Sequence, residues 1–520
     1  MQKASSICRS AALLLAAVPL AVMTGTLGTA LNLHAQAPAQ PPALPAVAGP
    51  LAAKYKPDAD RILAAASTDT DGYAALQYLT DHIGKRLSGS PQLNTAVTWG
   101  AELMRNAGFE NIRIQPVMVP HWVRGEESGT IIGPVTKPLH MLGLGMSVGT
   151  PKGGITAPVL FVKDFATFDA LPASDVRGKI VVFNPGWHGY GVNSQYRTAG
   201  PSRAASKGAV AVLVRSATGL VLQLPHTGTL RYDDKQPKVP AAAISVEDAL
   251  LIERLAKEGP VTVHLDMQAH MEPDVQAGNV MGEIRGSEHP EEIVVLGGHI
   301  DSWDVGQGAQ DDGSGIMGAF EAVSLLHKLG LKPKRTIRVV FWVNEENGGA
   351  GGKAYRDMLG DKVSEHVAAI EMDNGAEKPL GMGYGSFGSP RRPAAPAPGM
   401  ASSTPAASAA LDMSTLSANE KQSYTTMQDI VALLAPIGAD TVATSGGGSD
   451  IGPIVAEGVP SLSPRTVAEH YFDWHHTEAD TLDKVDLEDY RKNVAMLSVV
   501  AYVLADMDGK LAGRKGQFRE

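Results

Sequence analysis

The sequence has very little cysteine. Cys8 is the only one in 520 residues, and it precedes the first apolar run. The rest of the chain can therefore form no disulfide and offers no thiolate to a metal. Any metal must be held by histidine, aspartate and glutamate side chains. A chain of this length can bury enough apolar surface without disulfides, so their absence does not argue against an exported protein.

Positive charge is also in short supply. The formal net charge is −10, which argues against nucleic acid or an anionic membrane as a partner. After the first forty residues no run is long and apolar enough to span a bilayer. The length itself exceeds that of one ordinary domain and predicts two globular units.

The amino-terminal segment is typical of a secretory signal peptide. Lys3 and Arg9 precede a long apolar run, and small residues follow it. Of two Ala-x-Ala sites we favour the second, after Ala39, because the first would leave a proline directly after the cut. Residues 1–39 are thus predicted as signal peptide and residues 40–54 as a Pro/Ala-rich linker. An uncleaved membrane anchor is the alternative; otherwise we expect a secreted or periplasmic protein with no membrane contact after signal removal.

The remaining chain divides into three parts that differ in composition and in expected secondary structure. Residues 55–129 read as helices followed by a strand, the amino-terminal part of a catalytic domain. Residues 130–270 hold short strands broken by Gly and Pro, and no acid–histidine cluster stands out there. We therefore predict an inserted β-rich domain that supplies no metal ligand. Residues 271–513 complete the catalytic domain, interrupted at 389–423 by a low-complexity insertion expected to be disordered.

The catalytic part alternates continuous apolar strands with helices. "EEIVVLGGH", "TIRVVFWV", "HVAAIEMD" and "GVPSLSP" are predicted strands, and the intervening segments are predicted helices. Strands without an exposed polar face are buried on both sides. The fold class expected is α/β, with a mostly parallel mixed sheet covered by helices on both faces.

Acids and histidines follow four of these strands, at the point where each strand ends. They are His299, Asp301, Asp304, Asp311, Asp312, Glu345, Glu346, Asp373, His475, His476 and Asp480. Because ligands bind at the carboxyl ends of parallel strands, we expect these side chains to converge. Imidazoles and carboxylates without cysteine suit two Zn²⁺ ions sharing a bridging carboxylate, with another divalent ion left open.

Four motifs, "GGHIDSWDVGQGAQDDGSG", "NEENGG", "EMDNG" and "HHTEADT", resemble those of the co-catalytic di-zinc aminopeptidase family. The likeness covers most of residues 55–507 and is strongest to a secreted dipeptidase of that family. It implies the zinc-exopeptidase fold, of phosphorylase/hydrolase-like type. It also implies that the inserted segment is a protease-associated (PA) domain.

The resemblance assigns roles to particular residues. His299 and Asp373 would hold one metal, Glu346 and His476 the other, and Asp311 would bridge the two. Beside them, Glu345 would be the general base, and a cis peptide would join Asp311 to Asp312.

The remaining candidates are expected to support the ligands or touch the substrate; they are Asp301, Asp312, Asp450, His475 and Asp480. We expect the Asp301 carboxylate to accept the second N–H of His299. Asp480 is expected to do the same for His476. His475 either donates to the oxyanion or packs against its neighbours.

The function predicted is a zinc-dependent metallo-exopeptidase acting on dipeptides or short peptides through a metal-activated water. A glutaminyl-cyclase-like acyltransferase would bind one zinc through fewer of these ligands. A non-catalytic binding protein on the same scaffold would have lost ligands, and none is missing here. The resemblance leaves open whether the chain forms a homodimer.

Overall fold

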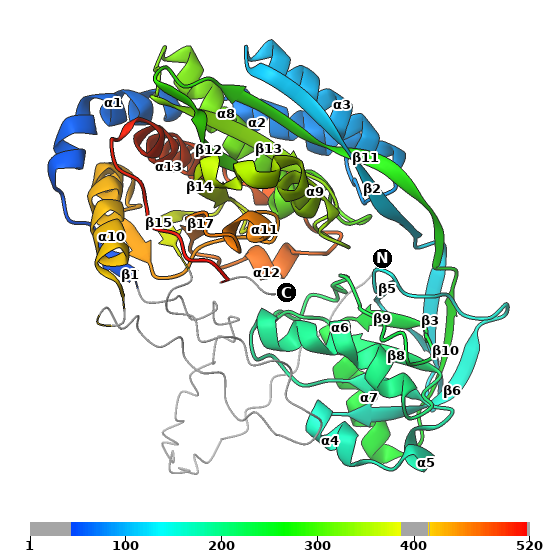
Figure 1. Cartoon of the computed structure of the whole chain (residues 1–520). Coiled ribbons are helices and arrows are strands. Elements are labelled where there is room, and N and C mark those ends of the chain that lie inside the picture. The colour runs from blue at the N-terminus through cyan, green and yellow to red at the C-terminus, as the bar shows by residue number, and fades with distance from the viewer. Residues whose placement is uncertain (1–42, 386–413, 415, 517–520) are drawn as a thin grey trace, which may run out of the picture. The chain divides into compact units, whose positions relative to one another are not determined.

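The computed structural model describes residues 43–385, 414 and 416–516, and it contains two sheets. The first sheet has nine strands (Figure 1), which are, in spatial order, β1 (Ala43–Pro45), β16 (Thr441–Ala443), β15 (Pro379–Tyr384), β17 (Ser461–Thr466), β14 (His366–Glu371), β12 (His289–His299), β13 (Arg335–Trp342), β11 (His270–Ile284) and β2 (Glu110–Val123). Strands β17, β14, β12 and β13 are parallel, and antiparallel pairs flank them. The predicted fold class is confirmed.

Helices cover both faces of this sheet. They are α1 (Pro50–Ala66), α2 (Asp71–Tyr78), α3 (Pro91–Asn106), α8 (Ser314–Lys328), α9 (Ala350–Leu359), α10 (Ala418–Val431), α11 (Gly452–Val455), α12 (Tyr471–Trp474) and α13 (Leu487–Asp506). Short 3-10 or π turns occur at Leu79–Ile83, Ala309–Gly313 (η2), Gly360–Glu365, Ala432–Ile437 and Leu482–Lys484.

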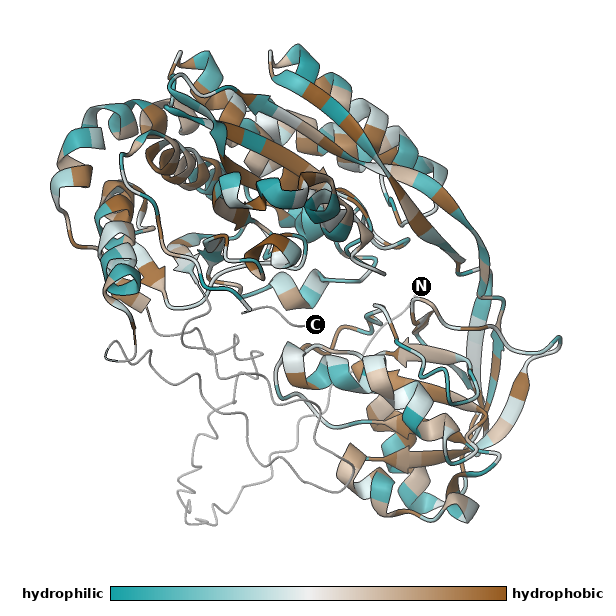
Figure 2. Cartoon of the chain, viewed as in Figure 1, coloured by the Kyte–Doolittle hydropathy of each residue, from teal (hydrophilic) through white to brown (hydrophobic). Residues whose placement is uncertain are grey.

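Side-chain alternation along β12 explains the two layers. Val294 and Leu296 belong to the core that includes α8 and α13, whereas Val295 packs into the core with α9 and α11. Successive strand residues point to opposite faces, so an uninterrupted apolar run serves both cores. Figure 2 shows the hydrophobic character of the central strands and of α13.

The second sheet has eight strands, β4 (Lys137–Pro138), β3 (Glu127–Gly133), β10 (Thr262–Met267), β6 (Ile155–Val162), β7 (Ile180–Phe183), β8 (Ala211–Arg215), β9 (Ala241–Ile244) and β5 (Met141–Gly143). Its helices are α4 (Phe165–Ala170), α5 (Ala173–Val176), α6 (Tyr190–Ala205) and α7 (Val246–Glu258). Strands β6 to β9 are parallel. Their short apolar runs are buried under α7 on one face and under α4 and α6 on the other, as is usual for parallel sheets. The identity of this segment as a PA domain stays a prediction.

A two-stranded ribbon joins the sheets. The chain leaves the first sheet along β2 and returns along β11, and these strands pair from Glu110 with Glu283 to Val123 with His270. The ribbon is the long pair at the right of Figure 1. Residues 127–267, which hold the second sheet, therefore enter and leave at neighbouring points.

The expected linker, residues 40–54, is partly regular structure. Its residues 43–45 form β1, which pairs with β16, and α1 begins at Pro50. The Asp429 carboxylate accepts the backbone N–H groups of Gly49, Leu51 and Ala52 at 2.6, 2.9 and 2.9 Å. These bonds satisfy donors that a helix start leaves free, and a proline suits the first turn.

The expected disordered insertion, residues 389–423, also ends in regular structure. Ser417 caps α10, and the Glu420 side chain accepts from the Ser417 backbone in return. The rest of the insertion, apart from residues 414 and 416, lies outside the described residues, as does the predicted signal peptide.

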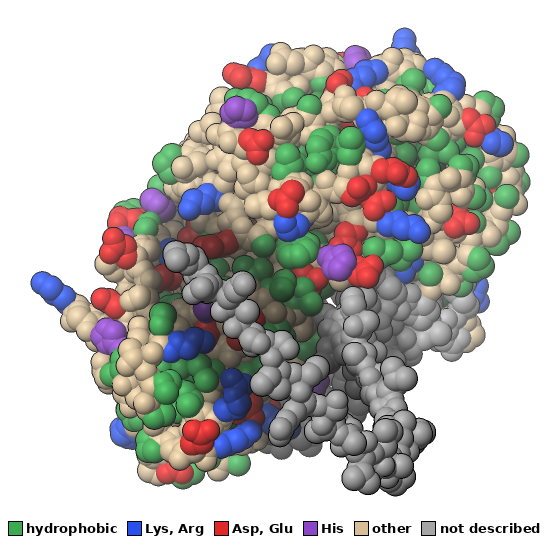
Figure 3. Space-filling model, turned by 180° about the vertical axis from the view of Figure 1, so that it is seen from behind, with side chains coloured by type: hydrophobic (Ala, Val, Ile, Leu, Met, Phe, Trp, Pro, Cys, Tyr) green, Lys and Arg blue, Asp and Glu red, His purple; other side chains and the backbone are tan. Residues whose placement is uncertain are grey.

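The surface carries charges of both signs. On the face in Figure 3, Lys and Arg side chains are interspersed with Asp and Glu. Within the described ranges, none of the helices combines the length and apolar composition that a membrane crossing needs.

Candidate metal centre

The predicted ligands come from the carboxyl ends of adjacent parallel strands. His299 is the last residue of β12, Glu346 follows β13 by four positions, and Asp373 follows β14 by two. Asp311 lies in η2, directly before α8, and His476 comes two residues after α12. The alternation of strand and helix thus brings distant motifs to one edge of the sheet, as predicted.

One group surrounds His299. Its Nε2 lies 3.3 Å from Asp311 Oδ1 and 3.6 Å from Asp373 Oδ1. Its Nδ1 lies 3.0 Å from the backbone carbonyl of Asp301. A proton on Nδ1 donated to that carbonyl leaves the Nε2 lone pair facing the two carboxylates. These three residues could share one metal ion.

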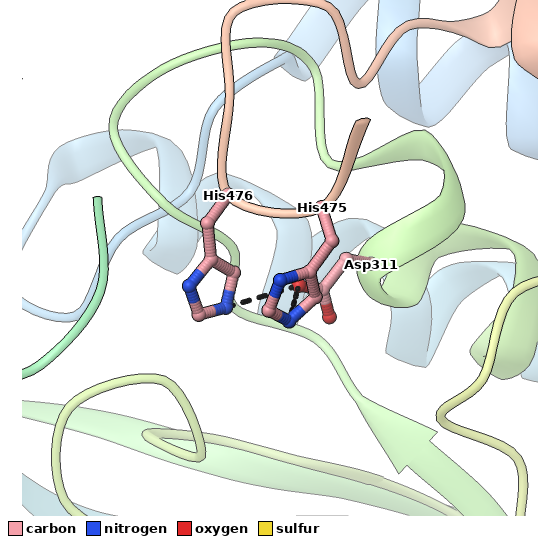
Figure 4. A group of neighbouring side chains, drawn as sticks. All are labelled: Asp311, His475 and His476. Carbon is pink, nitrogen blue, oxygen red and sulfur yellow. Dashed lines mark ion pairs between the residues drawn. The ribbon is translucent and has the colours of Figure 1, made fainter. Parts of the chain in front are cut away.

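The second group surrounds His476. Its Nε2 lies 3.0 Å from Glu346 Oε2 and 3.2 Å from Asp311 Oδ2. Asp311 therefore turns one oxygen to each histidine, which is the arrangement a bridging carboxylate needs. Figure 4 shows Asp311 beside His475 and His476. His475 Nε2 is also 3.4 Å from Asp311 Oδ2, and its ring stacks on that of His476 with centroids 3.6 Å apart.

His475 is thus closer to the centre than the sequence analysis anticipated. Asp311, His475 and His476 form a second set able to hold a metal ion. Burial, with the neighbouring His476, holds the pKa of His475 well below its ordinary value. A neutral imidazole is the form that a metal ligand or a hydrogen-bond donor would use.

Several of the candidate donor atoms have no hydrogen-bond partner in the part of the chain that the structure describes, which fits a role as metal ligands. Among the described residues, His299 Nε2, Asp311 Oδ2 and Glu346 Oε1 are buried without a hydrogen bond. Buried polar atoms normally have partners, so three such atoms at one place fit a site for a cation. Imidazole and carboxylate donors without cysteine suit Zn²⁺.

The electrostatics of the site point the same way. Burial and the charge of Asp311 raise the pKa of Glu346 to about 8. Burial also raises the pKa of Asp373 to about 6, with Asp311 and Glu345 adding to it. Crowded, desolvated carboxylates repel one another, and a divalent cation relieves that repulsion.

The two adjacent glutamates differ in exposure. Glu346 is buried, whereas Glu345 is partly exposed. Both backbone N–H groups donate to the Asp301 carboxylate, at 3.2 Å for Glu345 and 3.4 Å for Glu346. Glu345 can therefore face solvent and substrate while its neighbour faces the centre.

This contact corrects the predicted role of Asp301. Its nearest carboxylate oxygen is 4.0 Å from His299 Nδ1, while its backbone carbonyl accepts that N–H. The side chain instead holds the loop after β13. A short turn after His299 points the peptide carbonyl, rather than the side chain, back at the imidazole.

Asp480 also acts elsewhere than predicted. Its carboxylate accepts the backbone N–H groups of Ala309, Gln310 and Asp311, at 3.2, 2.7 and 3.2 Å. It therefore fixes the loop that carries Asp311 and does not hold His476. The Asp311–Asp312 peptide is cis, and Asp312 Oδ2 accepts the His299 backbone N–H at 3.0 Å.

Asp450 lies buried near this edge. Neither carboxylate oxygen has a hydrogen-bond partner among the described residues. Burial and the charge of Glu371 raise its pKa well above the ordinary value. Contact with substrate, the role suggested for it, stays a prediction.

Several supporting residues carry no motif. Arg86 is fully buried and donates to the carbonyls of Ile300, Gln307 and Gly308 at 2.7, 2.8 and 3.1 Å. Tyr471 Oη donates to Asp373 Oδ1 at 3.4 Å. Arg86 sits in an unremarkable "GKRLSG" stretch, and its partners are backbone atoms, so the sequence held no signal for it.

An α/β sheet with candidate metal ligands at its strand ends is typical of metal-dependent hydrolases, and comparison with known proteins gives the family. Residues 279–501 match Peptidase family M28. Carboxypeptidase Q of Mus musculus is 40% identical over 84% of this chain and 86% of that protein, and carboxypeptidase Q of Homo sapiens is 38% identical over the same shares. The crystal structure of a Peptidase M28 precursor from Shewanella amazonensis has a TM-score of 0.79 and 31% identity, covering 88% of this chain and 98% of that one.

The chain belongs to peptidase family M28, and the prediction of a metallo-exopeptidase is confirmed at that level. A zinc aminopeptidase from Bacillus subtilis shares the fold, with a TM-score of 0.60 at 19% identity over 84% of this chain and 95% of that one.

Proposed function

We propose that this protein is a zinc-dependent exopeptidase that hydrolyses dipeptides or short peptides, with two Zn²⁺ ions and Glu345 as general base. The observation that carries the proposal is Asp311, whose two oxygens lie 3.3 and 3.2 Å from Nε2 of His299 and His476. His299, Asp311 and Asp373 would hold one ion, and Asp311, Glu346 and His476 the other. His475 is an additional candidate for the second.

The metals and the residues divide the chemistry. Two bound zinc ions would lower the pKa of the attacking water and polarise the scissile carbonyl. Glu345, partly exposed at the edge of the centre, takes the proton from the water and passes it to the leaving amine. Asp301 holds the backbone of Glu345 and Glu346, so base and ligand keep their separate directions.

The acidic surroundings favour a substrate with a free amino group. The side chain of Asp373 is 22% exposed, so a carboxylate of the centre borders the open side. An amine can approach it there, which fits an aminopeptidase or dipeptidase. Relatives of this chain are named carboxypeptidase Q, so cleavage from the carboxyl end is the alternative to test.

The test is a substrate panel of free dipeptides, their N-acetyl forms and longer peptides, measured with and without zinc. We expect N-acetylation of a good dipeptide to reduce kcat/KM by at least tenfold, since each 1.4 kcal/mol of lost binding to the amine costs about a factor of ten. Equal rates for free and blocked substrates would contradict the proposal and favour a true carboxypeptidase or an endopeptidase.

We further propose that the protein is exported, which rests on the charged and apolar pattern of residues 1–39. Amino-terminal sequencing of the mature protein tests this. Cleavage after Ala39 would leave Gln40 as the first residue.

A further inference from the structure

Residues of the inserted segment lie directly behind one half of the metal centre. Thr227 and Thr229 belong to the stretch between β8 and β9 of the second sheet. The backbone carbonyl of Thr227 lies 3.3 Å from His476 Nδ1, and its N–H donates to the His476 carbonyl at 3.0 Å. Thr229 Oγ1 donates to the Glu346 carbonyl at 2.7 Å. Two of the candidate ligands of the second metal, Glu346 and His476, are therefore held from this stretch.

The Thr227 carbonyl decides which nitrogen of His476 carries the proton. Since Nε2 faces Glu346 and Asp311, the neutral ring must keep its proton on Nδ1 to bind a metal. That N–H needs an acceptor, and the Thr227 carbonyl is placed to be one. An outer partner of this kind fixes ring orientation and raises the basicity of the ligand.

Arg197 of α6 holds that carbonyl. Its NH1 donates to the Thr227 carbonyl at 2.9 Å and lies 3.4 Å from His476 Nδ1. A guanidinium has only donors, so it cannot accept the imidazole proton, and both groups must share the one carbonyl. Arg197 NH2 also donates to Tyr190 Oη at 2.8 Å, and the Tyr190 ring contacts His475 edge-on at 4.9 Å between centroids.

Two backbone features support the contact between the Thr227 loop, Arg197 and His476. A Cβ at Gly228 would lie 2.2 Å from Arg197 NH1, so only glycine between the two threonines admits the guanidinium. His476 has φ 62°, a left-handed conformation that costs a non-glycine residue about 1 kcal/mol or more. The hydrogen bond from Thr227 N–H to the His476 carbonyl supports this conformation from outside the loop.

The two halves of the centre thus differ in origin. The outer partner of His299 is Asp301, two residues along the same loop. The outer partner of His476 comes from a separate sheet. We propose that the inserted segment completes the second metal site, with Arg197 as a positioning residue that sets the affinity for that ion. The inference rests on the proposed two-metal function, and it means that the segment, although it supplies no direct ligand, is part of the metal centre.

The test is Zn²⁺ titration of the metal-free full-length protein by calorimetry and chelator competition. For Arg197→Met we expect one site to weaken by about tenfold while the other is unchanged. Loss of an outer partner costs about 10–100-fold in metal affinity, and the lower end applies because the Thr227 carbonyl stays but is no longer held by the guanidinium. Arg197→Lys, which keeps a charge and a donor, should recover part of the loss. Arg203→Met, on the same helix but facing Phe165 and Asp169, is the matched control and should bind both ions as wild type does.

Two outcomes are decisive and separable. Wild type binding fewer than two ions would overturn the proposed two-metal function. Wild type binding two, with both affinities of Arg197→Met within twofold of it, would overturn the role of the inserted segment alone. Should Arg197→Met be unfolded by circular dichroism, Thr229→Val replaces it, because it removes only a hydroxyl; a severalfold weakening of one site is expected, and unchanged affinities refute the inference.

Discussion

Glutamine substitutions at Glu345 and Glu346 should separate catalysis from metal binding. Glu345→Gln removes the proposed base but no ligand, so metal content and KM should stay close to wild type while kcat falls. General-base catalysis contributes roughly 10²–10⁴-fold, and a loss of that size or more is expected. Glu346→Gln removes a proposed charged ligand, whose Oε2 lies 3.0 Å from His476 Nε2, so metal content should fall toward one ion per chain.

The structure limits side effects of either change. The Asp301 carboxylate holds the backbone N–H of both residues, and neither substitution alters those bonds. Burial, with the charge of Asp311, raises the pKa of Glu346 to about 8, so a neutral amide there removes one of the crowded carboxylates. Excess zinc should therefore restore some activity to Glu346→Gln and none to Glu345→Gln.

The assay is elemental analysis of metal per chain beside steady-state kinetics on a free dipeptide. Glu291→Gln is the control, because Glu291 is exposed near the opposite end of β12 from His299. If Glu345→Gln lost a metal while Glu346→Gln kept both, the two roles would be reversed and the reasoning refuted.

Two further predictions concern buried charges outside the centre. Arg86→Met removes the hydrogen-bond donors of carbonyls in the loop after β12, including those of Ile300 and Gly308. Each buried group left unpaired costs about 1–3 kcal/mol, so the melting temperature should fall by several degrees. An unchanged melting temperature in calorimetry would contradict this. Burial raises the pKa of Glu321 from 4.5 to about 7, despite its contact with Lys328. The folded state then holds that proton more tightly than the unfolded state between about pH 4.5 and 7, so stability falls as pH rises through this window, by about 3 kcal/mol from this group. Glu321→Gln should flatten the slope in urea unfolding at pH 5 and pH 8, and parallel curves for the two proteins would exclude the effect.

The sequence predicted the parts of the site that depend on regular structure. His299, Glu346 and Asp373 follow apolar runs, and the rule that parallel strands present their carboxyl ends together brings these residues to one edge. The sheet itself followed from the same runs, because strands buried on both faces lack polar alternation.

Contacts made by backbone atoms of loops could not be predicted from the sequence. Asp301 and Asp480 lie near the candidate ligands, but which of their atoms contact which partners depends on turn geometry that the sequence does not show. Thr227 acts through its carbonyl, which every residue has, so no side-chain pattern marks it. The start of α1 was missed for a related reason, since its cap, Asp429, lies 380 positions away from Gly49.

That distant cap has a consequence for how the protein is made. Among the described strands β1 pairs with β16 alone, and backbone N–H groups in the first turn of α1 donate to Asp429. On a ribosome, β1 and α1 are synthesised long before these partners and must wait for them until most of the chain has been made. Closing so long a loop is a late event with a large entropic cost. The segment from Ala43 to Ala52 therefore cannot reach its final position until Asp429 and β16 have been synthesised.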